Sequence, residues 1–272
     1  MLPTFVISLS DSTDRRNLIW RRLSDLRISF EWVDAVDGRH GLAAEFEPMI
    51  DRVNGVDLGG LPLLDVEFAC ALSHIKALQM VIDRDLDYAL VMEDDAIPDP
   101  KLPEYLAGRH FVDAELTSLN YGRAWVRRGA KETIDGHRSY VVVPDVYLTS
   151  TAGYIVSREA ARHIVESALP VASNADWPAC TEWFKMQRRW RVVYPRLVHH
   201  APRETDPTTS IIYQHGKAAK KRQVRRILGV RMPRSGVTVR TWGRGVFGPL
   251  MGLKRIKRAG PADVPDLDDN GH

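Results

Sequence analysis

The residues best suited to chemistry are three consecutive acids, Glu93, Asp94 and Asp95, which follow the apolar run 88–92. A short apolar run bounded by turn formers predicts a strand buried on both faces of a parallel sheet. Open α/β sheets bind ligands outside the carboxyl ends of their strands, where these acids would lie. Neighbouring carboxylates repel one another unless a cation or hydrogen bonds hold them, and oxygen ligands suit Mg²⁺ or Mn²⁺. A solvated acidic turn is the alternative, and the triplet alone does not decide between the two.

The surrounding pattern predicts the elements that position these acids. Apolar periodicity and turn residues indicate strands at 4–9, 28–33, 88–92, 116–121, 139–143, 147–156 and 191–194. They indicate helices at 13–26, at 66–83 with Asp65 as its cap, at 158–168 capped by Ser157, and near 180–189. Residues 39–64 read as irregular, and Pro98 and Pro100 predict a loop directly after the acids. This order predicts an α/β sheet whose strand directions are mixed in its second half.

Several other classes of protein find no support in the sequence. It contains neither a GxGxxG nor a GxxxxGK[ST] motif, so a dinucleotide fold of the usual kind and a P-loop are not indicated. Cys70 and Cys180 lack metal-site spacing and are interpreted as small core residues. No apolar run approaches the roughly 20 residues that cross a bilayer, and the first residues lack the basic start of a secretory signal. A cytoplasmic location is therefore expected.

Charge divides the 272-residue chain near residue 207. Residues 207–262 contain fourteen lysines and arginines and no acid. Within 217–232 an apolar stripe is flanked by basic residues, which is typical of a helix that lies on an anionic membrane. Nucleic-acid binding and a merely solvated basic tail are the alternatives, but no nucleic-acid motif accompanies the charge and such a partner is not expected. We predict a folded domain over 1–212 and a basic, amphipathic, partly disordered extension over 213–272.

Five segments, read together, resemble glycosyltransferase family 25, which includes bacterial lipopolysaccharide and lipooligosaccharide glycosyltransferases. The segments are Val6-Ile7-Ser8-Leu9 with Asp14-Arg15-Arg16; Val33-Asp34-Ala35-Val36-Asp37-Gly38; Glu67-Phe68-Ala69-Cys70-Ala71-Leu72-Ser73-His74; the acidic triplet; and 150–161, with Asp176 beyond it. They occur in the family's order and cover roughly residues 4–212. One departure is visible, because Ala69 stands where the family more often has glycine.

The resemblance implies a GT-A-like, Rossmann-type mixed sheet flanked by helices, with the basic extension added. It also implies transfer of a hexose, galactose above all, from a UDP-sugar to a lipopolysaccharide or lipooligosaccharide glycan, with the help of Mn²⁺ or Mg²⁺. The partners are then a nucleotide sugar, a glycolipid or oligosaccharide acceptor, and the anionic inner-membrane surface, on which the enzyme would be peripheral. A carbohydrate-binding protein that kept the fold without turnover is the alternative.

Within that scheme the acids acquire different roles. Glu93 and Asp95 are the expected metal ligands because alternate residues of an extended segment project to the same side, and Asp94 would contact ribose or sugar hydroxyls. His199 and His200 are possible further ligands of the metal. An inverting transfer needs a base that accepts the proton of the acceptor hydroxyl. The candidates are Asp176 and then Glu182, with Trp177 and Trp183 as sugar-stacking or core residues.

The remaining candidates concern the donor. Arg15 and Arg16 could pair with a diphosphate through bidentate hydrogen bonds, or could belong to a solvated helix face. Asp34 and Asp37 could hold uracil or ribose hydroxyls, or could stabilise a turn. The residues expected at the donor are Ser8, Leu9, Arg15, Arg16, Asp34, Asp37, His74 and Asp94. Ser73 and His74 lie in an otherwise apolar helix, where a histidine is often a satisfied core residue.

Overall fold

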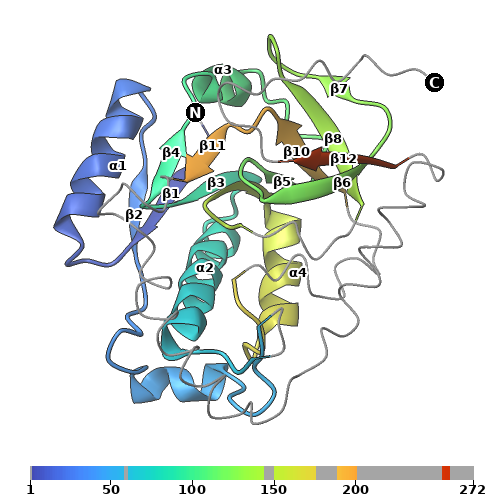
Figure 1. Ribbon diagram of the computed structural model, residues 1–272. Coiled ribbons are helices and arrows are strands. Elements are labelled where there is room, and N and C mark those ends of the chain that lie inside the picture. Colours follow the sequence, from blue (N-terminus) through green and yellow to red (C-terminus); the bar gives the residue numbers. More distant parts are fainter. Residues whose placement is uncertain (1, 58–60, 144–149, 176–188, 201–252, 258–272) are drawn as a thin grey trace.

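The computed structural model shows one large mixed sheet with helices on both faces (Figure 1). It describes residues 2–57, 61–143, 150–175, 189–200 and 253–257. The helices are α1 (Thr13–Asp25), the 3₁₀ helix η1 (Ala44–Met49), α2 (Asp65–Asp83), α3 (Leu102–Ala107) and α4 (Arg158–Ala168). The strands are β1 (Thr4–Ser8), β2 (Glu31–Asp34), β3 (Tyr88–Glu93), β4 (Ala96–Pro98), β5 (Leu116–Ser118), β6 (Arg123–Arg127), β7 (Lys131–Glu132), β8 (Arg138–Val143), β9 (Gly153–Ser157), β10 (Trp190–Tyr194), β11 (Val198–His200) and β12 (Leu253–Lys257).

The strand directions follow the predicted division of the sheet. Within the described residues, ten strands form one sheet in the order β12-β6-β8-β10-β5-β9-β3-β1-β2, with β7 beside β8. β1 runs parallel to both β2 and β3, whereas β9 is antiparallel to β3 and to β5. A second, two-stranded sheet pairs β4 with β11. The mixed α/β fold predicted from the sequence is confirmed.

Two hydrophobic cores, one on each face, hold the sheet. Phe5, Ile7 and Val91 belong to the core under α2 and α4, which lie side by side on one face (Figure 1). Their neighbours Val6 and Leu90 belong to the opposite core, which includes residues of α1 and α3. Side chains alternate between the faces of a strand, so an unbroken apolar run is required wherever both faces are covered. The predicted strand at 88–92 is therefore confirmed, and it is fully buried from Ala89 to Met92, with Tyr88 partly buried at its start.

The predicted elements differ from the structure in several bounds, and two of the differences lie beside the acids and their supporting helix. Asp65 is the first residue of α2, and its N-cap is Leu64, whose backbone N–H donates to the Glu67 carboxylate at 2.9 Å. The carboxylate of Asp65 instead accepts a hydrogen bond from Arg52 at 2.7 Å. The segment after the acids is also not all loop, because β4 ends at Pro98. That position is tolerable for proline because β4 belongs to a two-stranded sheet and only one neighbour needs its hydrogen bonds.

The predicted C-terminal extension contributes one described strand. β12 pairs antiparallel with β6 at the outer edge of the large sheet, so a short part of the predicted 213–272 extension belongs to the fold. The amphipathic helix expected over 217–232 and the helix expected near 180–189 lie outside the described residues. No helix in the described ranges is both long enough and apolar enough to cross a membrane.

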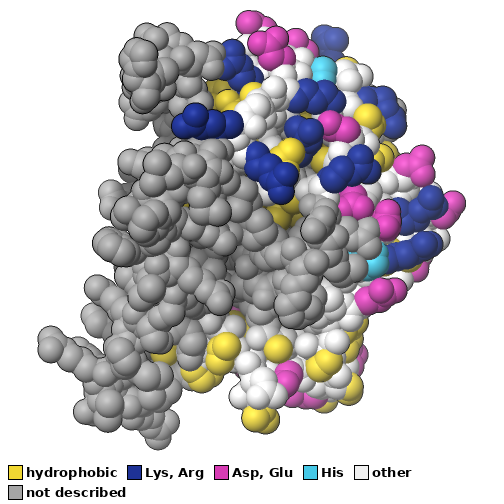
Figure 2. Space-filling model, turned by 90° about the vertical axis from the view of Figure 1, so that its right-hand side faces the viewer, with side chains coloured by type: hydrophobic (Ala, Val, Ile, Leu, Met, Phe, Trp, Pro, Cys, Tyr) yellow, Lys and Arg dark blue, Asp and Glu magenta, His cyan; other side chains and the backbone are white. Residues whose placement is uncertain are grey.

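The surface beside this edge carries charges of both signs. Figure 2 shows Lys and Arg side chains interspersed with Asp and Glu on the side of the molecule that lies at the right of Figure 1. On β7 and β8, Lys131 lies 3.2 Å from Asp113 and Arg138 lies 3.8 Å from Glu132. Exposed pairs of this kind contribute about 0–1 kcal/mol each, so the two cores rather than the surface stabilise the sheet.

Ser157 caps α4 as predicted, and the cap gives a first test of the fold. Its side chain accepts a hydrogen bond from the backbone N–H of Ala160 at 3.1 Å. We expect Ser157→Ala to lower the free energy of unfolding by about 1 kcal/mol, as loss of an N-cap does. Ser167→Ala in the same helix is the matched control, because this exposed serine donates only to the Ile164 carbonyl. Urea unfolding measures both, and equal losses in the two variants would contradict the assigned cap.

Candidate functional site

The cleft lies where three parallel strands end. β1, β2 and β3 run in one direction, so their carboxyl ends meet at one edge of the sheet, as expected for ligand sites in α/β folds. Antiparallel β9 begins at the same edge, because Gly153 pairs with Met92. The cleft is partly open to solvent and contains about 600 Å³ of empty space when its open mouth is included. Its polar lining residues are Ser8, Arg15, Asp37, Arg39, Ser73, His74, Glu93, Asp94 and Asp95, with Cys70 beside them.

One arginine connects the two aspartates of the triplet. Arg15, from the first turn of α1, contacts the Asp94 carboxylate directly and lies 3.4 Å from Oδ2 of Asp95. The Ser8 hydroxyl donates to Asp94 at 2.7 Å. Both aspartates are at least 95% buried, so their negative charge needs these partners. The structure therefore brings together four of the residues predicted for the donor and metal sites.

Asp95 also presents an oxygen toward a histidine. Its Oδ1 is buried and accepts no hydrogen bond within the described residues. Nδ1 of His200 lies 3.6 Å from this oxygen, because pairing of β11 with β4 sets His200 opposite Ala96. His199 points elsewhere, with its Nε2 3.8 Å from Asp99. Of the two histidines proposed as metal ligands, the structure places only His200 beside the triplet.

Glu93 faces a different wall of the cleft. Its Oε1 lies 3.2 Å from Nε2 of His74 and accepts a hydrogen bond from the Thr151 hydroxyl at 2.6 Å. The prediction that Glu93 and Asp95 project together, away from Asp94, is wrong. It assumed an extended segment, but β3 ends at Glu93 and the next two residues form a turn, so the strand alternation stops. Whether Glu93 also binds a cation stays a prediction.

The pKa values of Glu93 and Asp94 are shifted in opposite directions. Burial raises the pKa of Asp94 to about 6, against the lowering effect of Arg15 and Ser8, and the neighbouring charge of Asp95 raises it further. Burial also acts to raise the pKa of Glu93, but the contact with His74 outweighs it and holds the pKa below its usual value. Paired carboxyl groups whose pKa values are pushed apart are typical of functional sites.

The loop after β2 forms another side of the cleft. Ala69 fits here despite the departure from glycine, because Gly38 makes the room. A Cβ on Gly38 would lie 2.4 Å from the Asp65 backbone oxygen and 2.8 Å from the Ala69 Cβ. Close packing of this loop on α2 thus requires glycine at position 38. Asp37 in the loop is held by Arg39, which also reaches Asp11 at 2.6 Å.

The other predicted donor residues have mainly structural contacts. Arg16 binds the carbonyl oxygens of Ser8 and Leu9 and contacts the Asp34 carboxylate, and its guanidinium lies over Trp32. These contacts fix the turn between β1 and α1 and do not place Arg16 or Asp34 in the cleft lining.

His74 is within the cleft, as expected. Ser73 bridges elements, because its hydroxyl donates to the Ala69 carbonyl at 2.7 Å and accepts from the Val36 N–H at 2.8 Å. The base candidates Asp176 and Glu182, and the tryptophans Trp177 and Trp183, lie outside the described residues.

Three contributors were not assigned a role from the sequence. Cys70, interpreted as a core residue, is only half-buried and lines the cleft next to His74. Thr151 orients Glu93, and Arg39 closes the lining beside Asp37. Cys70 and His74 are four residues apart on a predicted helix, which placed both on one face, but nothing in the sequence showed that this face borders a cleft.

The fold and the cleft define an α/β protein with an acidic, arginine-containing ligand site at the carboxyl ends of parallel strands. The chain matches glycosyltransferase family 25 (LPS biosynthesis protein) over residues 1–177. This match covers more than half of the sequence, so the chain belongs to that family.

Curated relatives support the same placement. Procollagen galactosyltransferase 1-B of Xenopus laevis is 28% identical over 181 residues, which are 60% of this chain and 28% of the relative. The lipooligosaccharide biosynthesis protein lic2B of Haemophilus influenzae is 25% identical over 62% of this chain and 65% of its own length. A probable inactive glycosyltransferase 25 family member 3 of Bos taurus is 30% identical over 60% of this chain and 28% of the relative. The chain thus spans less than two thirds of each.

The raised pKa of Asp94 leads to a prediction about stability. A carboxyl group whose pKa rises from 3.8 to about 6 on folding destabilises the folded state when it is ionised. This cost is absent below pH 3.8, grows up to about pH 6 and is complete above it, where it is on the order of 3 kcal/mol. Asp94→Asn removes the charge, so we expect the variant to be more stable than the parent at pH 7.5, with a gain that shrinks toward pH 4.

Thermal unfolding of the chelator-treated protein at both pH values measures the effect. Asp135→Asn is the control, since the Asp135 side chain is 93% exposed and pairs only loosely with Lys101 at 3.3 Å. If Asp94→Asn were destabilised equally at both pH values, the ionised Asp94 carboxylate would not destabilise the folded protein as proposed.

Proposed function

We propose that this protein transfers a hexose, most specifically galactose, from a UDP-sugar to a lipooligosaccharide-type glycan, with a divalent cation and inversion at the anomeric carbon. The observation that carries the proposal is the Arg15, Asp95 and His200 group at the carboxyl ends of β1 and β3. Membership in family 25 supports transfer of a sugar. The names of the frog and Haemophilus relatives support galactose and a lipooligosaccharide acceptor respectively.

The residues present fit a hard or borderline divalent cation. Asp95 Oδ1 is a buried anionic oxygen without a hydrogen-bond donor among the described residues, and Nδ1 of His200 lies 3.6 Å away. Carboxylate and neutral imidazole together suit Mn²⁺. Asp95 and His200 would hold such an ion. Bound there, the cation would act as a Lewis acid that stabilises charge on the departing diphosphate.

Arg15 supplies a positively charged side chain next to Asp94 and Asp95. Its guanidinium touches both buried aspartates, and its side chain is only 14% exposed, so water screens it little. A fixed positive group aimed at the site where negative charge develops lowers the barrier without reorganisation. We assign Arg15 to the diphosphate of the donor. Asp94, directly after β3, holds the position of Arg15, and Ser8 at the end of β1 in turn fixes the Asp94 carboxylate.

The proton of the acceptor hydroxyl requires a base. Asp176 is the first candidate and Glu182 the second, and both remain proposals because they lie outside the described residues. A carboxylate there would accept the proton as the hydroxyl oxygen attacks the anomeric carbon from the side opposite the diphosphate. The anomeric configuration of the product, read by NMR, decides between inversion and retention.

The central test compares two pairs of neighbouring groups. We expect Asp95→Asn and His200→Gln each to reduce Mn²⁺-dependent release of UDP from UDP-galactose, Asp95→Asn by about 100-fold or more in kcat/KM. The matched controls are Asp99→Asn and His199→Gln, which alter a similar acid and histidine 3.8 Å apart on the same two segments, whereas only Asp95 also contacts Arg15.

The assay is run over several nucleotide sugars, with and without Mn²⁺. Activity that survives Asp95→Asn, or that falls equally in the control variants, would show that the assigned site is wrong. Absence of turnover with every donor, together with retained UDP-sugar binding by calorimetry, would favour a non-catalytic carbohydrate-binding protein. The bovine relative, whose name marks it as probably inactive, makes this second function a specific alternative.

A further part of the proposal concerns location. The fourteen basic residues of 207–262 suit the anionic inner face of the cytoplasmic membrane, where a lipid-anchored acceptor would be found. Because β12 lies in the sheet, truncation at residue 213 would damage the fold, and substitution is the cleaner test. We expect replacement of Lys220, Lys221, Arg222, Arg225 and Arg226 by Gln to weaken binding to phosphatidylglycerol vesicles by about 1,000-fold or more, at roughly 1 kcal/mol per residue.

Vesicle co-sedimentation measures this, with phosphatidylcholine vesicles as the uncharged control. Unchanged binding by the substituted protein would contradict the membrane proposal. Salt-sensitive binding to duplex DNA, lost on the same substitutions, would favour the nucleic-acid alternative instead.

A further inference from the structure

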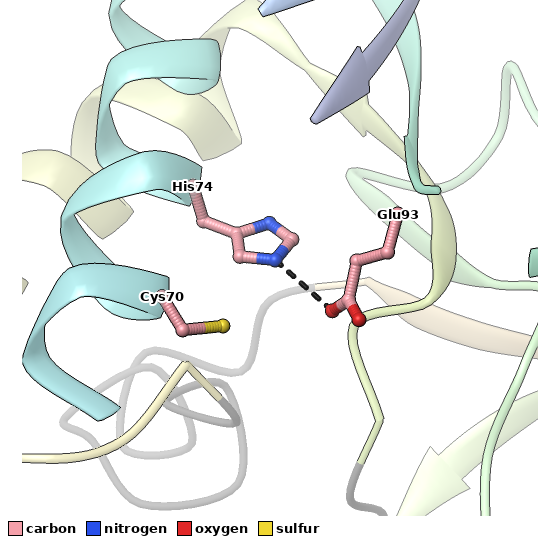
Figure 3. A group of neighbouring side chains, drawn as sticks. All are labelled: Cys70, His74 and Glu93. Atoms are coloured by element: carbon pink, nitrogen blue, oxygen red, sulfur yellow. Dashed lines mark hydrogen bonds and ion pairs between the residues drawn. The ribbon is translucent and has the colours of Figure 1, made fainter. Parts of the chain in front are cut away.

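Three side chains of different chemistry converge in the cleft beside the acidic triplet. Cys70 and His74 lie one turn apart on α2, and Glu93 ends β3 opposite them (Figure 3). One ligand atom from each, the Cys70 Sγ, a His74 ring nitrogen and a Glu93 oxygen, lie within 4.8 Å of one another. All three residues line the cleft. A thiol, an imidazole and a carboxylate in this arrangement form a set of ligands for a metal ion.

The distances are close to those of a tetrahedral site. Bonds of about 2.3 Å to sulfur and about 2.0 Å to nitrogen or oxygen place neighbouring ligand atoms about 3.3–3.6 Å apart. Nε2 of His74 and Oε1 of Glu93 are already 3.2 Å apart. The thiol must approach by about 1 Å, which rotation of the half-buried Cys70 side chain can supply.

Further groups orient the ligands from behind. The Tyr154 hydroxyl lies 3.0 Å from Nδ1 of the fully buried His74, which leaves Nε2 directed at Glu93. The Thr151 hydroxyl holds the Glu93 carboxylate at 2.6 Å. Ligand histidines and carboxylates in metal sites are usually fixed by such hydrogen bonds. Two of the three side chains are therefore held in place by hydrogen bonds to neighbouring hydroxyls, as metal ligands commonly are.

We propose that Cys70, His74 and Glu93 form a binding site for a thiophilic divalent cation, Zn²⁺, distinct from the Asp95 and His200 group. The thiolate selects zinc over Mg²⁺ and Mn²⁺, which prefer oxygen ligands. The Cys70 thiol releases its proton to solvent on binding, so affinity falls as the pH is lowered. Three protein ligands leave the fourth position open toward the cleft, for water or another small ligand. This inference does not depend on the proposed transfer reaction.

Cobalt provides a direct probe of the sulfur ligand. Co²⁺ added to the metal-free protein should produce a thiolate-to-cobalt charge-transfer absorption in the near ultraviolet, which Zn²⁺ then abolishes by displacement. We expect Cys70→Ala to lose this absorption and to weaken Zn²⁺ binding at least tenfold, measured by competition with a chromophoric chelator. Cys180→Ala is the matched control and should change neither.

Two more variants locate the site. Glu93→Gln should weaken Zn²⁺ binding by a similar factor, whereas Asp95→Asn should leave it unchanged, and circular dichroism confirms that each variant is folded. An absorption retained in Cys70→Ala, or lost in Cys180→Ala, would overturn the proposal. So would zinc binding that depends on Asp95, or the absence of stoichiometric binding to the parent protein at pH 7.5.

Discussion

The burial of Asp94 and Asp95 beside Arg15 is the interaction on which the site depends. Two carboxylates removed from water at a strand end repel each other, and Arg15, the one guanidinium that contacts both among the described residues, compensates only part of that cost. The raised pKa of Asp94 and the oxygen of Asp95 that accepts no hydrogen bond from the described residues both follow from this shortage of positive charge. A site with this imbalance favours a second cation, which is the physical basis of the proposed metal and diphosphate chemistry.

The sheet topology creates that imbalance. Because β1 and β3 are parallel, Ser8 and the triplet lie at one edge of the sheet. Arg15, at the start of α1, contacts the triplet there. Antiparallel β9 and the small β4 and β11 pair then bring Thr151 and His200 to the same edge from distant parts of the chain. The turn after Glu93 separates the acids between two walls. Asp94 and Asp95 face Arg15, while Glu93 faces Cys70 and His74, so one short sequence serves two chemically different groups.

Local pattern predicted the buried parts of this arrangement well. Continuous apolar runs identified β1 and β3, and Ser157 marked the start of α4, because each signal lies within the element itself. β4 and β11 were missed, since strands of three residues depend on their partner and carry little pattern of their own. The role of Cys70 was inaccessible for the same reason, and His200, proposed as a metal ligand together with His199, could not be distinguished from it. Each is defined by a residue distant in sequence, Glu93 in one case and Asp95 in the other, and strand alternation misjudged the acids once the chain turned after β3.

The position of the cation relative to the triplet is the most direct test of the proposed site. Anomalous X-ray scattering from crystals grown with Mn²⁺ and UDP would locate the manganese directly. We predict one peak in contact with Asp95 and His200, with the UDP diphosphate bridging the ion and Arg15. A manganese peak remote from Asp95, or UDP bound with its diphosphate away from Arg15, would contradict the central claim.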